Sequence, residues 1–380
     1  MTRHYLDHAS TSPLRPEARA AMVAVLDGPA GDPGRIHAEG LGARVVLEQA
    51  REQVAGLLGA RGREVVFTSG ATEAIATACW GAAERGAHQV VSAVEHSAVR
   101  EAAARHGAVT VVGVDSRGRV DPDEVLAAVR PDTAAVHVQW GNHEVGTTQP
   151  VSEIVAGCRE RGVLVHVDAA QAAGREPIDF RALGADLCSV SAHKLGGPPG
   201  AGALLVRRGL RLRPLLVGGD QERARRGGLE NVPAIAGFGA ASEALTTDDR
   251  LAGEASDARA RTDRVLAAAP GMDGVSTYGD PDRRLPHLVC LGIGGIEPQA
   301  VLLGLDRAGV ACHSGSACSS EALEPSPVLE AMGVDAHRSL RVSVGWSSID
   351  ADIDALLAAV PEVIAGLRRL GRTGNGAGRV

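Results

Sequence analysis

Apolar runs and helical patterns alternate along the first two-thirds of the chain. Seven continuous runs rich in Val, Leu and Ala read as buried strands, at 64–68, 89–94, 108–114, 134–140, 163–168, 187–192 and 202–208. The helical segments between them include 71–84, 97–106, 121–129 and 150–161. Apolar strands separated by helices are typical of a mostly parallel sheet that is covered on both faces. The pattern predicts an α/β domain with functional loops at the strand ends.

The pattern changes after about residue 245. It predicts a long helix at 248–268, a strand at 287–293, helices at 297–308 and 324–333, a strand at 339–345 and a helix at 348–370. Such a mixture is typical of a smaller α+β domain. We expect residues 16–245 to form the large domain, residues 1–15 and 246–370 the small domain, and residues 371–380 a disordered tail.

Composition excludes several classes of protein. A chain of 380 residues is long enough for two domains with a sizeable core, and its net charge of −7 gives no general reason to expect nucleic-acid binding. There is no apolar run of the length that spans a membrane and no signal peptide, so we expect a cytoplasmic protein without membrane contact. Six cysteines in so long a chain do not indicate a disulfide framework.

One residue is unusual by its isolation. Lys194, in the run SAHKLGG, is the only lysine, whereas the other 38 of the 39 Lys and Arg residues are arginines. Arginine stays protonated, but a buried lysine amine can lose its proton and condense with a carbonyl group. Lys194 is therefore a candidate for covalent attachment of a cofactor.

Two further features precede Lys194 along the chain. The run SGATEA follows the first predicted strand and places free backbone N–H groups of Ser69, Gly70, Ala71 and Thr72 at a helix start, where an anion can bind. Asp168 closes an apolar strand, where a carboxylate needs a cation such as a protonated ring nitrogen. A phosphate site, a strand-end acid and an isolated lysine together indicate pyridoxal phosphate. The first strand-to-helix turn lacks G-x-G-x-x-G, which disfavours a nicotinamide cofactor.

A series of recognisable motifs is spread over almost the whole chain. In order, they are YLDHASTSPL, DPGRIH, FTSGATEA, VEHSAV, NHEVGTTQP, HVDAAQAAG, SAHKLGGPPGAGALLVRR, GGDQERARRGGLENVP, SGSACSS, LEPSPVL and SLRVSVG. With them the chain resembles the group I cysteine desulfurases of the class V aminotransferase superfamily. The resemblance implies PLP fold type I, similar to aspartate aminotransferase, with a mostly parallel seven-stranded sheet in the large domain.

The resemblance also implies roles for individual residues. Lys194 is expected to bind pyridoxal phosphate as a Schiff base, Asp168 to pair with the ring nitrogen and Gln171 to reach the ring oxygen. His96 is expected to stack on the ring and to act as an acid–base group. The remaining expected cofactor contacts are Ala71, Thr72, Ser191 and His193 at the phosphate, and His143 near the ring.

Two residues are expected to bind the substrate. They are Asn142 and Arg341, whose guanidinium suits bidentate binding of a carboxylate. The sequence also departs from the family pattern. His143 stands where the family usually has the second Asn of NNE, Leu229 stands where a threonine is common, and Ile75 and Ala76 replace a polar pair. These changes indicate a specialised paralogue.

Cys318 lies in HSGSACSS, a run of small residues that offers a cysteine little packing. We predict that it is an exposed nucleophile on a mobile loop. Cys312, His313 and Cys318 are too few for a structural zinc site, so no metal is expected. A disulfide between Cys312 and Cys318 remains open.

The resulting expectation is a homodimeric enzyme that converts L-cysteine to L-alanine. The sulfur forms a persulfide on Cys318 and passes to an acceptor protein or a small thiol. Two alternatives are kept. One is a selenocysteine or cysteine sulfinate lyase or a related aminotransferase, and the other is a non-catalytic scaffold that binds a sulfur acceptor.

Overall fold

A computed structural model describes residues 2–315 and 325–376. Its large sheet has the order β2-β8-β7-β6-β5-β3-β4. The neighbouring pairs from β7 to β4 are parallel, and β8 is antiparallel to both of its neighbours. The strands are β2 (Val65–Thr68), β3 (His88–Ser92), β4 (Ala108–Val112), β5 (Thr133–Gln139), β6 (Leu164–Asp168), β7 (Leu187–Ser191) and β8 (Gly202–Val206). The predicted mostly parallel seven-stranded sheet is confirmed.

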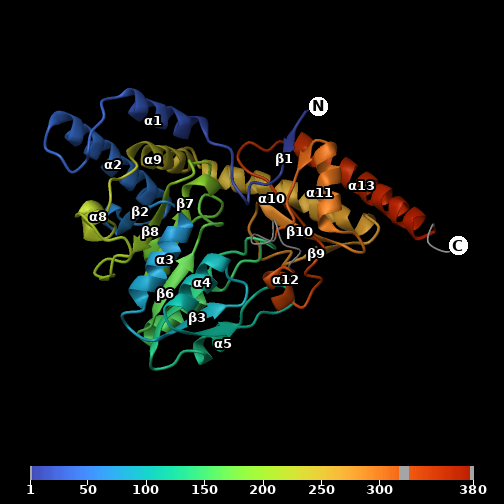
Figure 1. The fold of residues 1–380 in the computed structure, drawn as a ribbon, viewed down its shortest axis with the longest axis horizontal. Coiled ribbons are helices and arrows are strands. Elements are labelled where there is room, and N and C mark those ends of the chain that lie inside the picture. Colours follow the sequence, from blue (N-terminus) through green and yellow to red (C-terminus); the bar gives the residue numbers. More distant parts are fainter. Residues whose placement is uncertain (1, 316–324, 377–380) are drawn as a thin grey trace.

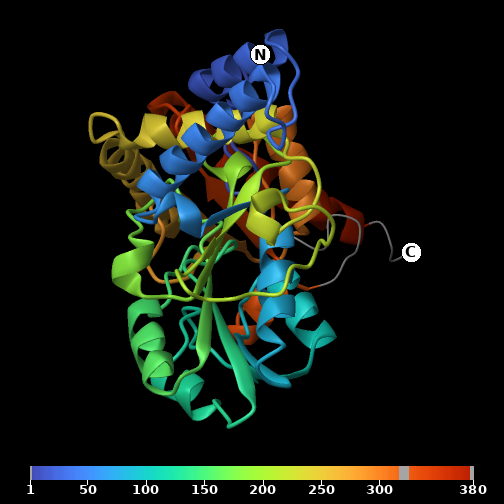
Figure 2. The ribbon, with the colours of Figure 1, turned by 90° about the vertical axis from the view of Figure 1, so that its left-hand side faces the viewer.

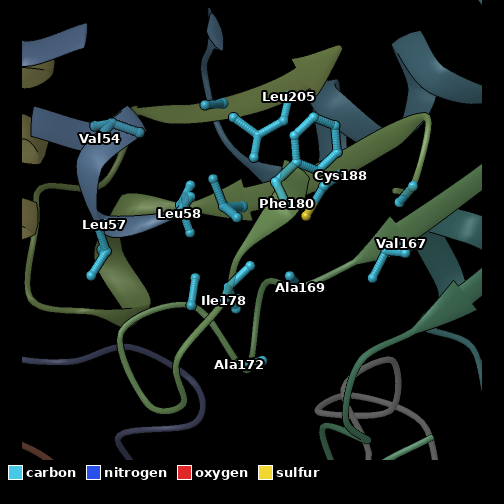
Figure 3. Close-up of a cluster of buried hydrophobic side chains, with 14 of the residues drawn as sticks. Val54, Leu57, Leu58, Val167, Ala169, Ala172, Ile178, Phe180, Cys188 and Leu205 are labelled. Atoms are coloured by element: carbon cyan, nitrogen blue, oxygen red, sulfur yellow. The ribbon is translucent and has the colours of Figure 1, made fainter. Parts of the chain in front are cut away.

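Helices cover both faces of this sheet (Figure 2). The helices of residues 16–246 are α1 (Pro16–Asp27), α2 (Ala38–Leu57), α3 (Ala71–Ala82), α4 (Ser97–Arg105), α5 (Pro122–Ala127), α6 (Val151–Glu160), α7 (Phe180–Leu183), α8 (Gln221–Ala224) and α9 (Val232–Thr246). Helix α3 packs its alanines on one face, against Ala135, Leu164 and Leu187. The opposite face carries the larger apolar cluster, in which Phe180 lies near Cys188 and Leu205 (Figure 3).

The three helices α1, α2 and α9 lie outside the segments that the hydrophobic pattern predicted. Helix α9 packs against both α1 and α2. Most of its residues are buried, among them Phe238, Ala241 and Leu245. A helix that is covered on several sides lacks the polar stripe that makes an amphipathic helix recognisable in sequence.

The chain after α9, together with β1 at the amino terminus, forms a second group of elements around two small sheets. The three-stranded sheet has the order β12-β10-β9, and β1 pairs with β11. These elements are β1 (His4–Tyr5), α10 (Arg250–Ala268), β9 (Val275–Tyr278), β10 (Leu288–Ile293), α11 (Pro298–Arg307), β11 (Val310–Ala311), α12 (Pro327–Ala331), β12 (Ser339–Ser343) and α13 (Asp350–Gly376). The amino terminus therefore lies beside C-terminal elements (Figure 1).

Two observations bear on the predicted boundaries. The elements around the small sheets have an apolar cluster of their own, which includes Leu6 together with Leu291, Leu340 and Leu356. The proposed division into two domains stays a prediction, which this separate cluster supports. Helix α13 runs to Gly376 rather than ending at residue 370. Within the described residues, no helix has the length and apolarity needed to cross a bilayer.

Candidate active site

The predicted site residues come together at the carboxyl ends of the central strands. A cavity of about 550 Å³ lies between the large sheet and β12. It is lined by ten of the predicted residues, namely Ala71, Thr72, His96, His143, Asp168, Gln171, Ser191, His193, Lys194 and Arg341. Parallel strands end at the same edge of a sheet, which explains how residues from distant segments meet there.

Asp168 is the last residue of β6 and is 8% exposed. Its Oδ1 accepts hydrogen bonds from the backbone N–H of Ala170 and from the hydroxyl of Ser189, both at 3.0 Å. Both bonds fall on the same oxygen, so Oδ2 is available to a group in the cavity. A carboxylate held in this way suits a protonated nitrogen.

Lys194 ends a short 3-10 turn, Ala192–Lys194, that follows β7. Its backbone carbonyl accepts bonds from Ser12 Oγ at 3.1 Å and from Arg175 Nη2 at 2.9 Å. Burial lowers the pKa of the Lys194 ammonium to about 8, an effect that Arg341 increases and Asp168 opposes. At neutral pH this raises the neutral fraction from about one in a thousand to about a tenth. The side chain is suited to covalent attachment.

An anion cradle lies at the start of α3, which begins at Ala71. Ala71 and Thr72 face the cavity with the positive end of the helix. The N–H of Ser69 is already used, because it donates to Glu73 Oε2 at 2.8 Å. Arg226 in turn donates to Glu73 Oε1 at 2.9 Å and balances its charge. The helix end can therefore still attract a phosphate.

Two further expected phosphate ligands approach from the end of β7. Ser191 is its last residue and lines the cavity. His193 also lines the cavity, and its Nδ1 lies 3.1 Å from Thr11 Oγ1. Burial, together with the nearby charge of Lys194, lowers the pKa of His193 to about 4. His193 is therefore a neutral hydrogen-bonding group near pH 7.

His96 and His143 meet in an edge-to-face contact. His96 caps α4, and its Nδ1 accepts from the N–H of Ala98 at 3.1 Å. The imidazole rings are 5.0 Å apart between centroids, at 67°. Burial lowers the pKa of His96 and holds that of His143 well below its usual value. His143 Nδ1 is buried and has no hydrogen-bond partner among the described residues. The two rings form a neutral wall of the cavity.

Gln171 follows β6 and is held at both ends of its side-chain amide. Nε2 donates to the carbonyl of Ala9 at 2.9 Å, and Oε1 lies 3.3 Å from His287 Nε2. These contacts fix the orientation of the amide at the cavity wall. The sequence motif HVDAAQ identified Gln171, but it gave no sign of Ala9 or His287.

Arg341 lies on β12 and is 3% exposed. Nη1 donates to the carbonyl of His143 at 2.8 Å, and Nη2 donates to Asp7 Oδ1 at 3.0 Å and to Ser10 Oγ at 2.7 Å. Nε is buried and has no partner among the described residues. The guanidinium is thus oriented by three neighbours and keeps donor capacity for a carboxylate.

Of the other two predicted residues, one does not line the cavity. Asn142 is fully buried, and its amide is used by the backbone: Nδ2 donates to Val94 O, and Oδ1 accepts from Glu144 N and Val145 N. It holds the loop after β5 in shape, and its side chain is committed to that task rather than to a substrate. The other residue, Cys318, lies outside the described residues.

Several residues at the site were not predicted. Ser10 and Gln139 line the cavity, and His313 lines it next to Arg341. The backbone N–H of Arg341 donates to the carbonyl of His313 at 2.7 Å. The sequence singles out His313 only as a possible metal ligand, and within the parts of the chain that the structure describes no cluster of His, Cys, Asp and Glu is suited to a metal ion. In the sequence, only the proximity of His313 to Cys318 indicates that His313 belongs to the site.

These residues fit pyridoxal phosphate. The cavity offers an amine that can lose its proton, a carboxylate oxygen for a ring nitrogen, a helix start for a phosphate and a buried guanidinium for a substrate carboxylate. Four such groups around one cavity match the separate parts of that cofactor and an amino acid.

Comparison with known proteins agrees with this geometry. The model of the class V aminotransferases matches residues 4–356. A cysteine desulfurase of Gluconacetobacter diazotrophicus is 42% identical over 99% of this chain and 97% of its own length. Cysteine desulfurase IscS 1 of Archaeoglobus fulgidus is 39% identical over 96% of this chain and 98% of its own length.

Solved structures show the same fold. The structure of a NifS-like protein superposes with a TM-score of 0.89 at 31% identity and covers 96% of this chain and 100% of its own. The structure described as SspA in complex with cysteine has a TM-score of 0.79 at 28% identity and covers 92% of this chain and 100% of its own. The chain therefore belongs to the class V aminotransferases, which are pyridoxal phosphate enzymes, and within them to the cysteine desulfurases.

Proposed function

We propose that Lys194, Asp168 and Arg341 perform the cysteine desulfurase reaction in this cavity and that Cys318 receives the sulfur. One observation carries the assignment: a lysine with a lowered pKa shares a cavity with a carboxylate oxygen and a buried guanidinium. The similarity to cysteine desulfurases over almost the whole chain favours this reaction over the lyase and scaffold alternatives.

Each residue has a defined task in the proposal. Pyridoxal phosphate, held covalently by Lys194, supplies an electron sink that weakens the bonds at the substrate Cα. Arg341 binds the carboxylate of L-cysteine and orients its Cα. The amine of Lys194, once released by the substrate, removes the Cα proton, for which a pKa near 8 is suitable. His96 serves as the nearby acid–base group.

The sulfur transfer requires a nucleophile. In the proposal, the thiolate of Cys318 attacks the sulfur of cysteine, the carbon–sulfur bond breaks, and the carbon skeleton leaves as L-alanine after it gains a proton. The persulfide on Cys318 then passes to an acceptor protein or a small thiol. Cys312 is less suitable, because burial raises the pKa of its thiol strongly, and Asp7 raises it further.

Peptide mass spectrometry tests this assignment. After brief incubation with pyridoxal phosphate and L-cysteine, the peptide with Cys318 is expected to carry one extra sulfur atom. Cys318→Ser should lose alanine formation and keep the cofactor, whereas Cys312→Ser should behave as wild type. Lys194→Ala should abolish the modification. An unmodified Cys318 in an enzyme that forms alanine would contradict the role of this cysteine.

Homodimer formation is a second part of the proposal. Large apolar side chains are exposed on α2, just before α2, and on the segments that flank α8, among them Ile36 (92%), Val45 (65%), Val217 (81%) and Leu229 (63%). An apolar surface of this kind is typical of a protein interface. The double variant Val45→Glu and Val217→Glu should sediment as a monomer, and a dimer with unchanged affinity would contradict this interface. The cytoplasmic location stays a prediction.

A further inference from the structure

A row of buried polar side chains crosses the large sheet and ends at Asp168. Its members are Gln89 on β3, His137 on β5, His166 on β6 and Ser189 on β7, each at most 1% exposed. His137 and His166 are register partners, as are Asp168 and Ser189. Side chains two residues apart on a strand point to the same face, so the row lies on the face that α3 covers.

The row is continuous. Gln89 Oε1 lies 2.7 Å from His137 Nε2, and the Nδ1 atoms of His137 and His166 are 3.1 Å apart. His166 Nε2 lies 3.2 Å from Ser189 Oγ, which lies 3.0 Å from Asp168 Oδ1. Such a row inside a sheet is costly unless every group is satisfied, so the positions of its protons can be derived.

The donor and the acceptor of each hydrogen bond in the row can be assigned by starting from the carboxylate of Asp168. An ionised Asp168 only accepts, so Ser189 must donate its single hydroxyl proton to it and must accept from His166 Nε2. His166 Nδ1 then accepts from His137 Nδ1. Burial lowers the pKa of His137 to about 4 and holds that of His166 well below its usual value, so both rings are neutral.

Gln89, at the other end of the row, must then donate a hydrogen bond to His137. A neutral His137 that donates from Nδ1 accepts at Nε2, which requires the NH₂ group of Gln89 at that position. This is the flipped amide orientation, which heavy-atom positions alone do not distinguish. In the unflipped orientation, Gln89 Nε2 is buried without a partner among the described residues. All four hydrogen bonds therefore point toward Asp168.

We propose that Ser189 is a positioning residue for Asp168, and that His166, His137 and Gln89 fix the direction in which its hydroxyl donates. The inference rests on the proposed contact between Asp168 and the cofactor's ring nitrogen. The Ser189 hydroxyl supplies one of the two hydrogen bonds that fix Oδ1 of Asp168, and the carboxylate is thereby oriented with Oδ2 free for the ring nitrogen. A carboxylate held in that position favours the protonated form of the ring nitrogen.

The test measures the ring nitrogen directly. Enzyme loaded with pyridoxal phosphate that is labelled with ¹⁵N in the ring is titrated with pH, and the nitrogen chemical shift is followed by NMR. Ser189→Ala should lower the titration midpoint by about one pH unit, which is the loss of about one hydrogen bond. Ser189→Thr should restore the wild-type midpoint. His166→Phe leaves the serine in place but removes the donor behind it, and should shift the midpoint in the same direction by less.

Two control variants show whether a shift of the midpoint arises from the row of hydrogen bonds. Ser242→Ala removes another fully buried hydroxyl, which donates to Phe238 O and does not line the cavity, and should leave the midpoint unchanged. Asp168→Asn should remove the protonated ring-nitrogen signal altogether. Among the described residues, Asp168 acts electrostatically on Glu95, His96, Cys188 and Lys194, and every variant retains these four groups.

The outcomes distinguish the inference from the proposal beneath it. A midpoint shift in Ser189→Ala and His166→Phe, but not in Ser242→Ala, supports the row. Wild-type midpoints in Ser189→Ala and His166→Phe, together with loss of the signal in Asp168→Asn, would contradict the positioning role of the row. They would leave the role of Asp168 intact. An unchanged signal in Asp168→Asn overturns both. If Ser189→Ala does not bind the cofactor, the midpoint of His166→Phe decides alone.

Discussion

Nη2 of Arg341 donates a 3.0 Å hydrogen bond to Oδ1 of Asp7, which joins the strand β12 to the amino-terminal segment. Asp7, close to the amino terminus, thereby orients the guanidinium of Arg341 at the cavity. Nε of this guanidinium is buried and has no hydrogen-bond partner among the described residues. A substrate carboxylate meets a donor group whose position is set before it binds.

Replacement of this guanidinium should weaken substrate binding. Arg341→Lys keeps the charge but loses the planar donor pair and the contacts to His143 and Asp7. We expect KM for L-cysteine to rise by about 10- to 100-fold, the effect of losing roughly 1.5–3 kcal/mol of charge-assisted hydrogen bonding. Steady-state kinetics check this, with Arg338→Lys as the control, because Arg338 pairs with Asp335 at the surface. An unchanged KM in Arg341→Lys would exclude a direct contact.

The lowered pKa of Lys194 predicts how cofactor binding depends on pH. Only the neutral amine condenses with the aldehyde of pyridoxal phosphate, and burial places its pKa at about 8. The rate of covalent binding to the apoprotein should rise about tenfold per pH unit up to pH 8 and level off above it. Borohydride trapping measures this rate, and Lys194→Ala should trap nothing. A rate that keeps rising to pH 10 would indicate an ordinary, solvated lysine.

His143 should not contribute to the pH profile. Burial holds the pKa of its imidazole well below the usual value, so the ring stays neutral throughout the working range. His143→Asn, which restores the residue common in the family, should therefore leave the acid limb of kcat/KM against pH in place. The value of kcat/KM should change by less than about tenfold, or ~1.4 kcal/mol. A displaced acid limb would show that His143 is protonated during turnover.

The position of α8 should depend on one buried ion pair. Both guanidinium nitrogens Nη1 and Nη2 of Arg51 lie 2.7 Å from the carboxylate of Glu222, which also accepts from the N–H of Phe67. Glu222→Gln removes the buried counter-charge of Arg51, which then keeps the exposed Glu48 as its carboxylate partner, and should lower the free energy of unfolding by about 3–5 kcal/mol.

Urea denaturation of the apoprotein measures this effect, and the same arginine supplies the control. Glu48 pairs with Arg51 at 3.2 Å but is 46% exposed, so Glu48→Gln should cost less than ~1 kcal/mol. Equal losses in the two variants would show that the burial of Glu222 is not what makes its pair important.

Local patterns were sufficient for some of these features. Each of the seven strands carries its own apolar run, so each could be located from sequence. The direction of β8 could not, because an apolar run contains no information about the strand beside which it pairs. Asn142 shows a similar limit: its motif identified the residue, but its amide binds Val94 O and two backbone N–H groups, and only the folded loop reveals these partners.

By itself, the sequence determined the chemistry that is available: one lysine, a strand-end aspartate, a helix start that can bind phosphate, and an arginine in SLRVSVG. The tertiary structure decided which of these groups share a cavity and how each is oriented. The pairing of Asp7 with Arg341 and the row from Gln89 to Asp168 depend on side chains brought together from separate strands and loops. Strand register and burial set such distances, and neither is a property of any single segment of the chain.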